Sequence, residues 1–340
     1  MLVALLGTTT AGSPGGSGNS LLASAAASGR PRECASNARR GLSRGPSVWE
    51  VARVPNLQRY CDLVARAHAQ LATTPDAAKE SAELAEETLP GRASPAVILA
   101  RASLALGSVD DAAKSFAAAR AIDPRSLEDP STMHDFARVL VKTGKIGDAI
   151  TVYRALVPRI DLLATADKRV SVLLEAAHVS MAAEGRERSG AADRPSADKP
   201  AERRLDEAAA YLREARQRPA TQFTGDVLLS LVLALDRAGD RELAEAALAD
   251  AHRLTAKTRA GVLDYLAAPE DKLALDALSL EGSDRGAAIK SWETFLAGPG
   301  GKGPWAAAAR ARLDALKKGG GKSAKARPAA PPPRASGKTR

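Results

Sequence analysis

Alanine and proline recur at a fixed spacing along part of the chain, and this spacing is the feature that most restricts the fold. A shift of 34 residues places Ala78 on Ala112 and Pro90 on Pro124. A repeat of this length is a single supersecondary unit that cannot bury its apolar face alone, so successive units must stack. Alanine dominates the apolar residues and only 3% of the chain is aromatic, which favours closely packed helices over β-sheets.

Residues 93–126 carry the pattern most completely. Small residues or glycine stand where two helices must approach or turn, a large apolar residue stands between them, and proline follows. In order these are Ala100, Gly107, Ala112, Phe116, Ala119 and Pro124. The pattern resembles the tetratricopeptide repeat, whose members have these residue types at positions 8, 15, 20, 24, 27 and 32. The resemblance implies an all-α fold, a right-handed superhelical solenoid of antiparallel helix pairs.

About five such units and a C-terminal capping helix are expected. The first begins at Arg59 and has Thr73 in place of glycine, and the next after 93–126 begins at Pro130 and has Gly144 at its turn. The remaining predicted helices are Val170–Ala183 paired with Leu205–Gln217, a unit from Gly225 with Gly239 at its turn, Lys272–Glu281 paired with Arg285–Leu296, and the cap at Pro304–Lys317.

Three regions follow from composition and charge. Residues 1–47 form a low-complexity leader, 48–316 the helical array with a flexible insertion at 185–203, and 317–340 a basic tail predicted to be disordered. The tail has eight basic residues and no acid, so the net charge of +9 belongs mainly to the flanks. Residues 51–316 carry a charge of about −2 and do not resemble a basic nucleic-acid-binding domain.

The compartment is left open by the sequence. The leader contains an apolar run and an Ala-Ser-Ala site but no basic start, so it reads as a degraded signal peptide, a misplaced start codon, or disorder. Cys34 and Cys61 form a disulfide only in an oxidising compartment, and two unrelated thiols are the favoured interpretation. An exported or periplasmic location is slightly favoured over a cytoplasmic one, and no apolar stretch approaches the length of a membrane span.

No constellation typical of catalysis or metal binding is found. The four histidines, His68, His134, His178 and His252, fall in different predicted helices, and none forms a zinc-ligand motif with another histidine or a cysteine. Glycine-rich nucleotide loops and a GxSxG nucleophile motif are absent from the sequence. We therefore expect neither an enzyme nor a cofactor nor a metal, with each histidine structural or at the surface.

The resemblance implies that function lies in a concave groove lined by the first helix of each pair. The residues that the family places there are Val97, Arg101, His134, Arg138, Lys142, Leu229, Leu233 and Arg237. Arg101 and Arg138 occupy the same position in adjacent units, so they would form a basic ladder for an acidic peptide or, in the favoured alternative, solvated surface charges. The lysine and asparagine clamp of chaperone-binding relatives is not matched.

The expected function is a non-catalytic scaffold that holds a segment of a partner protein. The Ala/Arg/Gly-rich composition suggests a bacterial source, and the resemblance suggests a part in envelope complex assembly. The alternative is an adaptor that associates with nucleic acid or an anionic surface through the tail. Such binding would be electrostatic and sensitive to salt, because residues 317–340 contain no aromatic side chain to stack on bases.

Overall fold

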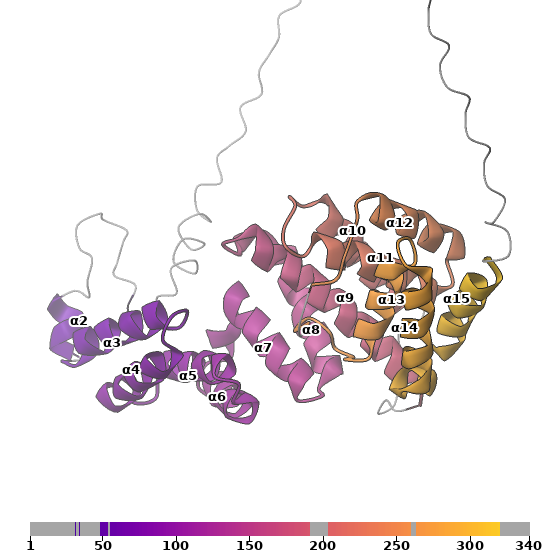
Figure 1. Ribbon diagram of the computed structural model, residues 1–340. Helices are drawn as coiled ribbons and strands as arrows, with labels where there is room; N and C mark the ends of the chain where they lie inside the picture. The colour runs from indigo at the N-terminus through magenta and orange to yellow at the C-terminus, as the bar shows by residue number, and fades with distance from the viewer. Residues whose placement is uncertain are drawn as a thin grey trace, which may run out of the picture. The chain divides into compact units, whose positions relative to one another are not determined.

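Every regular element in the described part of the chain is helical. A computed structural model describes residues 31, 34, 48–53, 55–190, 203–259 and 263–319, and no strand occurs among them (Figure 1). The predicted all-α fold is therefore confirmed. Most of the predicted leader, most of the insertion and nearly all of the tail lie outside the described residues.

The chain divides into two compact units, Met1–Lys145 and Ile146–Arg340. The first unit contains α2 (Val48–Arg53), α3 (Leu57–Gln70), α4 (Pro75–Thr88), α5 (Ala93–Ala105), α6 (Val109–Ile122) and α7 (Pro130–Lys142). The second contains α8 (Ile146–Leu156), α9 (Ala166–Arg188), α10 (Arg203–Gln217), α11 (Thr224–Ala238), α12 (Arg241–Arg253), α13 (Asp271–Leu280), α14 (Arg285–Ala297) and α15 (Ala306–Gly319). Short 3-10 helices follow α6, α8 and α14, at Pro124–Leu127, Val157–Leu162 and Pro299–Gly301.

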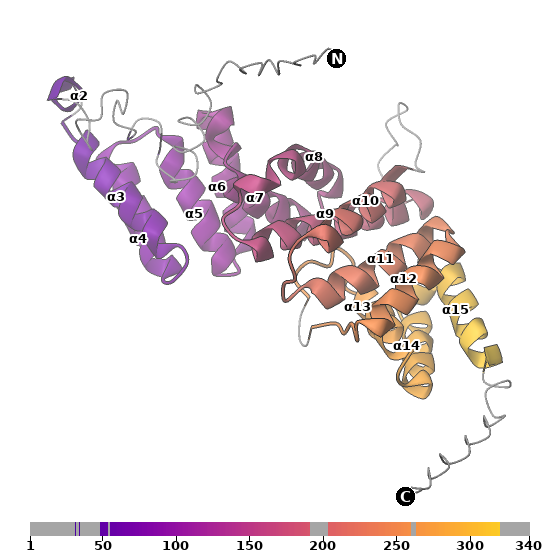
Figure 2. The same cartoon turned by 90° about the horizontal axis from the view of Figure 1, so that it is seen from above.

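Neighbouring helices pack as antiparallel pairs within each unit (Figure 2). The pairs are α3 with α4 and α5 with α6 in the first unit, and α9 with α10, α11 with α12 and α13 with α14 in the second. These pairs were predicted from the repeat. The predicted pair that begins at Pro130 is divided between the two units, with α7 in the first and α8 in the second. The helix α15 packs on α14, in the place predicted for a capping helix.

The alanines at the repeat positions are fully buried. Ala100, Ala112 and Ala119 have no exposed surface, and neither does Phe116 at the large apolar position. The same holds for the corresponding small residues of other units, namely Ala78, Ala85, Ala137, Ala149, Ala244, Ala251 and Ala288. A larger side chain at these positions would overpack the contact, which explains why the period is visible in alanine. The helix pairs thus have the arrangement of tetratricopeptide-type repeats.

Three first helices end in the same way, at the glycines that the pattern predicted. Gly107, Gly144 and Gly239 have φ angles of 81°, 76° and 86°, in the left-handed region that favours glycine. In each case the next residue's N–H donates to a carbonyl five residues back, a bond typical of a Schellman helix end. These bonds are Ser108 to Ser103, Lys145 to Leu140 and Asp240 to Leu235.

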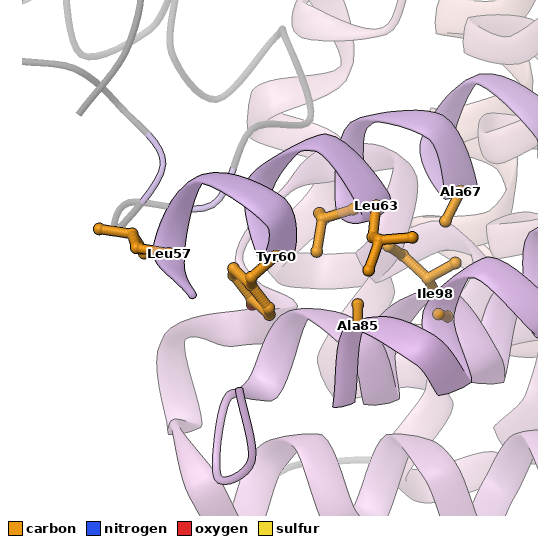
Figure 3. Packing of buried hydrophobic residues seen from close by; sticks show 8 residues of the cluster. Leu57, Tyr60, Leu63, Ala67, Ala85 and Ile98 are labelled. Carbon is orange, nitrogen blue, oxygen red and sulfur yellow. The ribbon is translucent and has the colours of Figure 1, made fainter. Parts of the chain in front are cut away.

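A disulfide fastens an N-terminal residue to the first helix pair. Cys34 is bonded to Cys61 of α3, with 5.6 Å between their Cα atoms, so the favoured interpretation of two unrelated thiols was wrong. Both half-cystines pack against a cluster formed by α3, α4 and α5. Figure 3 shows Tyr60 and Leu63 of α3 lying toward Ala85 of α4 in that cluster.

The predicted insertion begins later than expected. The helix α9 continues to Arg188, five residues beyond the predicted end at Ala183. Arg188 Nε donates to Glu184 Oε1 at 2.8 Å, one turn earlier, and such a pair stabilises the last turn of a helix. The predicted flexibility therefore does not apply to residues 185–188, and residues 191–202 lie outside the described part.

Replacing Ala112 by leucine should lower the free energy of unfolding by about 1–3 kcal/mol, because the buried contact between α5 and α6 cannot accept three more carbon atoms. Ala118→Leu is the matched control, since Ala118 is exposed on the same helix. Its effect should stay within about 0.5 kcal/mol. Urea unfolding measures both, and equal midpoints for the two variants would reject the assigned register.

Removing the disulfide with Cys34→Ala and Cys61→Ala should cost about 2–4 kcal/mol, because closing a loop over a separation of 27 residues restricts the unfolded chain. The free energy of unfolding of the wild type should fall by a similar amount in the presence of a reducing agent. A midpoint that does not respond to the reducing agent would contradict the bond.

Candidate functional site

The predicted groove residues of the first unit lie on the first helices α5 and α7. Arg101 and His134 are half-buried, as is Arg138, whereas Lys142 is exposed. Val97 is only 6% exposed and packs in the core formed by α5, α6 and α7. Val97 is therefore a core residue of the α5–α6 pair, which offers little surface to a partner.

The two arginines of the proposed ladder are separated by a carboxylate. Arg101 Nε donates to Asp135 Oδ2 of α7 at 2.7 Å, and about a fifth of each side chain is exposed. The surface therefore alternates in sign from Arg101 to Asp135 to Arg138 along the two helices. An uninterrupted basic ladder does not fit this structure, because Asp135 already holds the Arg101 guanidinium.

His68 of α3 stays uncharged beside this surface at neutral pH. Burial lowers the pKa of His68 to about 4, and the positive charge of Arg101 adds to the effect while Asp129 opposes it. The face of α3, α5 and α7 therefore owes its charge at neutral pH to its arginines, lysine and aspartates. His68 contributes a neutral, mostly buried ring, in keeping with the structural role expected for it.

The corresponding helices of the second unit are covered. Leu229, Leu233 and Arg237 of α11 are 0%, 4% and 6% exposed, so the expectation that they line an open surface does not hold. Two segments of the same unit contribute to the cover. Tyr265, in the connection between α12 and α13, is 3% exposed, and Trp305, just before α15, stacks over the Arg237 guanidinium at 4.9 Å.

Arg237 is the centre of a buried ion pair. Its Nη1 donates to Asp271 Oδ2 of α13 at 2.9 Å, and Nη2 donates to the other carboxylate oxygen. Trp305 also lies against α9, where a Cβ added to Gly185 would come within 3.2 Å of the indole Nε1. The arginine predicted to bind a partner thus ties α11 to α13 beneath the C-terminal segment.

His178 of α9 joins the same polar core. Its Nε2 lies 2.9 Å from Ser230 Oγ, and its Nδ1 lies 4.0 Å from Asp271 Oδ2. The residue types are those of a hydrolytic triad. However, Ser230 has no exposed surface, and both oxygens of Asp271 are bound by Arg237. Burial lowers the pKa of His178 to about 4, so the imidazole is neutral at physiological pH and acts as a polar contact between helices.

Several polar contacts of this core were missed by sequence reasoning. Arg312 of α15 bonds to Asp236 and Glu281, and Arg259 bonds to Asp226 of α11. A period-based search finds positions that recur, and these residues lie in a cap and a connection that do not recur. Asp226 stands in the first turn of α11, where acidic residues are common at exposed helix starts, so its burial had no signal in the sequence.

The described residues contain no group of histidine, cysteine and carboxylate side chains that could hold a metal ion. Nor does any described helix have the length and apolar character needed to cross a membrane.

Comparison with known proteins adds little beyond the fold. No protein-family model matches the chain, and no curated protein matches its sequence. A crystal structure of nearly identical TPR-like repeats from Podosopora anserina, described as a kinesin light chain, is 18% identical. It covers 60% of this chain and 98% of its own, with a TM-score of 0.40. At that similarity the tetratricopeptide-type arrangement rests on this chain's own buried alanines and helix ends.

Replacing Arg237 by alanine should destabilise the second unit by about 3–5 kcal/mol, because Asp271 would be left as a buried, uncompensated charge. Arg101→Ala is the matched control, and it should cost at most about 1 kcal/mol since its ion pair is partly solvated. Urea unfolding compares the two. If Arg237→Ala were as mild as the control, Arg237 would belong to an accessible surface after all.

Proposed function

We propose that the chain is a non-catalytic scaffold that binds a segment of a partner protein along the first-helix face of its first unit. The observation that carries this proposal is the difference between the two units. The four polar groove residues of α5 and α7 remain partly or wholly accessible, whereas the groove residues of α11 in the second unit are covered by its own chain. Paired-helix repeats bind partners through such faces, so the first unit is the better candidate.

The alternating charges of this face favour a partner segment of mixed charge. Arg138 and Lys142 are one helical turn apart on α7, and Asp135 precedes Arg138 by three residues on the same helix. Guanidinium groups suit carboxylates because they donate two parallel hydrogen bonds. A partner that offers an acidic side chain to Arg138 and a basic one toward Asp135 would match the face.

An exported location, in a bacterial envelope complex, is the finer part of the proposal. It is supported by the disulfide between Cys34 and Cys61, since such bonds persist in oxidising compartments and are rare in the cytosol. An oxidising compartment would also keep the first helix pair, which carries the bond, in its stable form.

The double substitution Arg138→Ala and Lys142→Ala should weaken binding of a partner recovered by crosslinking. The loss should be about 2 kcal/mol or more, roughly 30-fold in Kd, if the two side chains are central to the interface. The melting temperature should barely change, because neither side chain is fully buried.

The control is Lys114→Ala with Arg120→Ala, which removes the same charge from exposed positions of α6, a second helix. If this control weakened binding as much, the first-helix face would not be the interface. Deleting residues 320–340 tests the alternative of an adaptor: loss of every partner in that variant, with the α7 variant unaffected, would favour binding through the tail.

A further inference from the structure

His178 lies where three first helices of the second unit meet. It belongs to α9, its Nε2 atom lies 2.9 Å from Ser230 Oγ of α11, and its Nδ1 atom lies 4.0 Å from Asp271 Oδ2 of α13. The Tyr265 ring, from the connection between α12 and α13, packs against the imidazole with 5.1 Å between the ring centroids. One imidazole therefore lies against two further helices and against the segment that covers them.

This junction of α9, α11 and α13 is buried and its charges balance while His178 is neutral. The His178 side chain and Ser230 have no exposed surface. The charged groups that act on the imidazole are Asp271 and Arg237, and they neutralise each other, because both carboxylate oxygens accept from the guanidinium. Tyr265 is the other titratable side chain against the ring. Among the described residues, His178 Nδ1 has no hydrogen-bond partner.

The carboxylates that flank His178 on α9 are engaged with other groups. Glu175 Oε2 accepts from the Tyr153 hydroxyl of α8 at 2.8 Å. Glu184 Oε1 accepts from Arg188 Nε, also at 2.8 Å. Neither carboxylate is therefore held in place to balance a positive charge on the His178 ring.

Uptake of a proton at His178 Nδ1 is unfavourable while the junction stays closed. An imidazolium would be a second cation beside Asp271, which Arg237 already neutralises. Burial lowers the pKa of His178 to about 4, with Asp271 opposing this effect and Arg237 adding to it. A histidine in water has a pKa of about 6.5. Because the pKa is lower in the folded state, the stability that neutral His178 provides is complete above about pH 6.5 and is lost as the pH falls through about 4.

We propose that His178 is an acid sensor, whose protonation opens the junction of α9, α11 and α13 and exposes the first-helix face of the second unit. The charged ring must be hydrated, so Tyr265 and Asp271 have to move away from it. That movement uncovers Leu229 and Leu233 of α11, which are 0% and 4% exposed in the closed junction. This regulation concerns the second unit and goes beyond the scaffold function proposed for the first.

Hydrogen exchange of the α11 amides, residues 227–237, tests the proposal in the full chain. Between pH 7 and pH 5, after correction for intrinsic exchange rates, protection in the wild type should fall about 20-fold more than in His178→Gln. This factor follows from a pKa of about 4 in the closed junction and about 6.5 in the open one. Glutamine keeps a polar amide but takes up no proton in this range. An equal fall in the two proteins would overturn the proposal.

The matched control is His252→Gln, which removes another histidine of the same unit. His252 Nε2 lies 3.0 Å from the Leu278 carbonyl oxygen, away from the junction. This variant should keep the acid response of the wild type. If it lost the response as His178→Gln should, the sensor would not be His178.

The distribution of the response separates opening of the junction from unfolding of the whole chain. The loss of protection that depends on His178 should occur in α9, α11 and α13 and should be absent from α5 of the first unit. A loss of equal size in α5 would indicate global unfolding and would count against a sensor.

A titration of the wild type followed by NMR tests the same point without any substitution. The His178 ring resonances should keep their neutral positions at pH 5 in every molecule whose junction is closed. Titration of the ring near pH 6.5 with α11 still fully protected would overturn the proposal. None of these measurements probes partner binding by α5 and α7, so their failure would leave the proposed scaffold function untouched.

Discussion

Alanine at the helix contacts is the constraint on which the rest of the structure depends. Ala112 and Ala119 have no exposed surface, so the repeat places its smallest side chains at buried contacts between helices. Contacts between small side chains offer few interlocking shapes that could fix the register of one helix pair on the next. Ion pairs recur with the same spacing as the alanines. Arg101–Asp135, Arg216–Asp250 and Arg237–Asp271 each join residues 34 positions apart, which is one period of the repeat. Such pairs contribute little net stability, yet a wrong register would leave each charge without its partner.

Both units are built from antiparallel helix pairs, but the faces of their first helices differ in exposure. In the first unit short connections, residues 89–92 and 123–129, join each described pair to the next helix, and the first helices α5 and α7 keep partly exposed polar side chains. In the second unit the connection between α12 and α13 runs from residue 254 to 270, and the segment before α15 contains four glycines and two prolines. These longer, irregular segments place Tyr265 against the ring of His178 and Trp305 over Arg237. An added segment has thus turned a surface of the repeat into an interior.

Sequence reasoning found what recurs and missed what occurs once. The helix pairs, the buried alanines and the left-handed Gly107, Gly144 and Gly239 all follow from the period, because each unit faces the same packing problem. The disulfide was not predictable in this way, since nothing in the pattern says that Cys34 lies near α3. The burial of Leu229, Leu233 and Arg237 was missed for a related reason. Their helix matches the family pattern, and only the non-repeating segments that cover it distinguish it from an open groove. The partner-binding role of the residues on α5 and α7 stays a prediction.

Arginines and carboxylates are paired in the interior of the second unit. Residues 51–316 carry a charge of only about −2. In the second unit, Arg237, Arg259 and Arg312 each form an ion pair with an aspartate. Asp226 and Asp271 are buried, the Asp236 side chain is 14% exposed, and each is bound by an arginine from another element. A buried carboxylate that loses its arginine is costly, so each pair fixes the element that carries the arginine against the helix that carries the carboxylate.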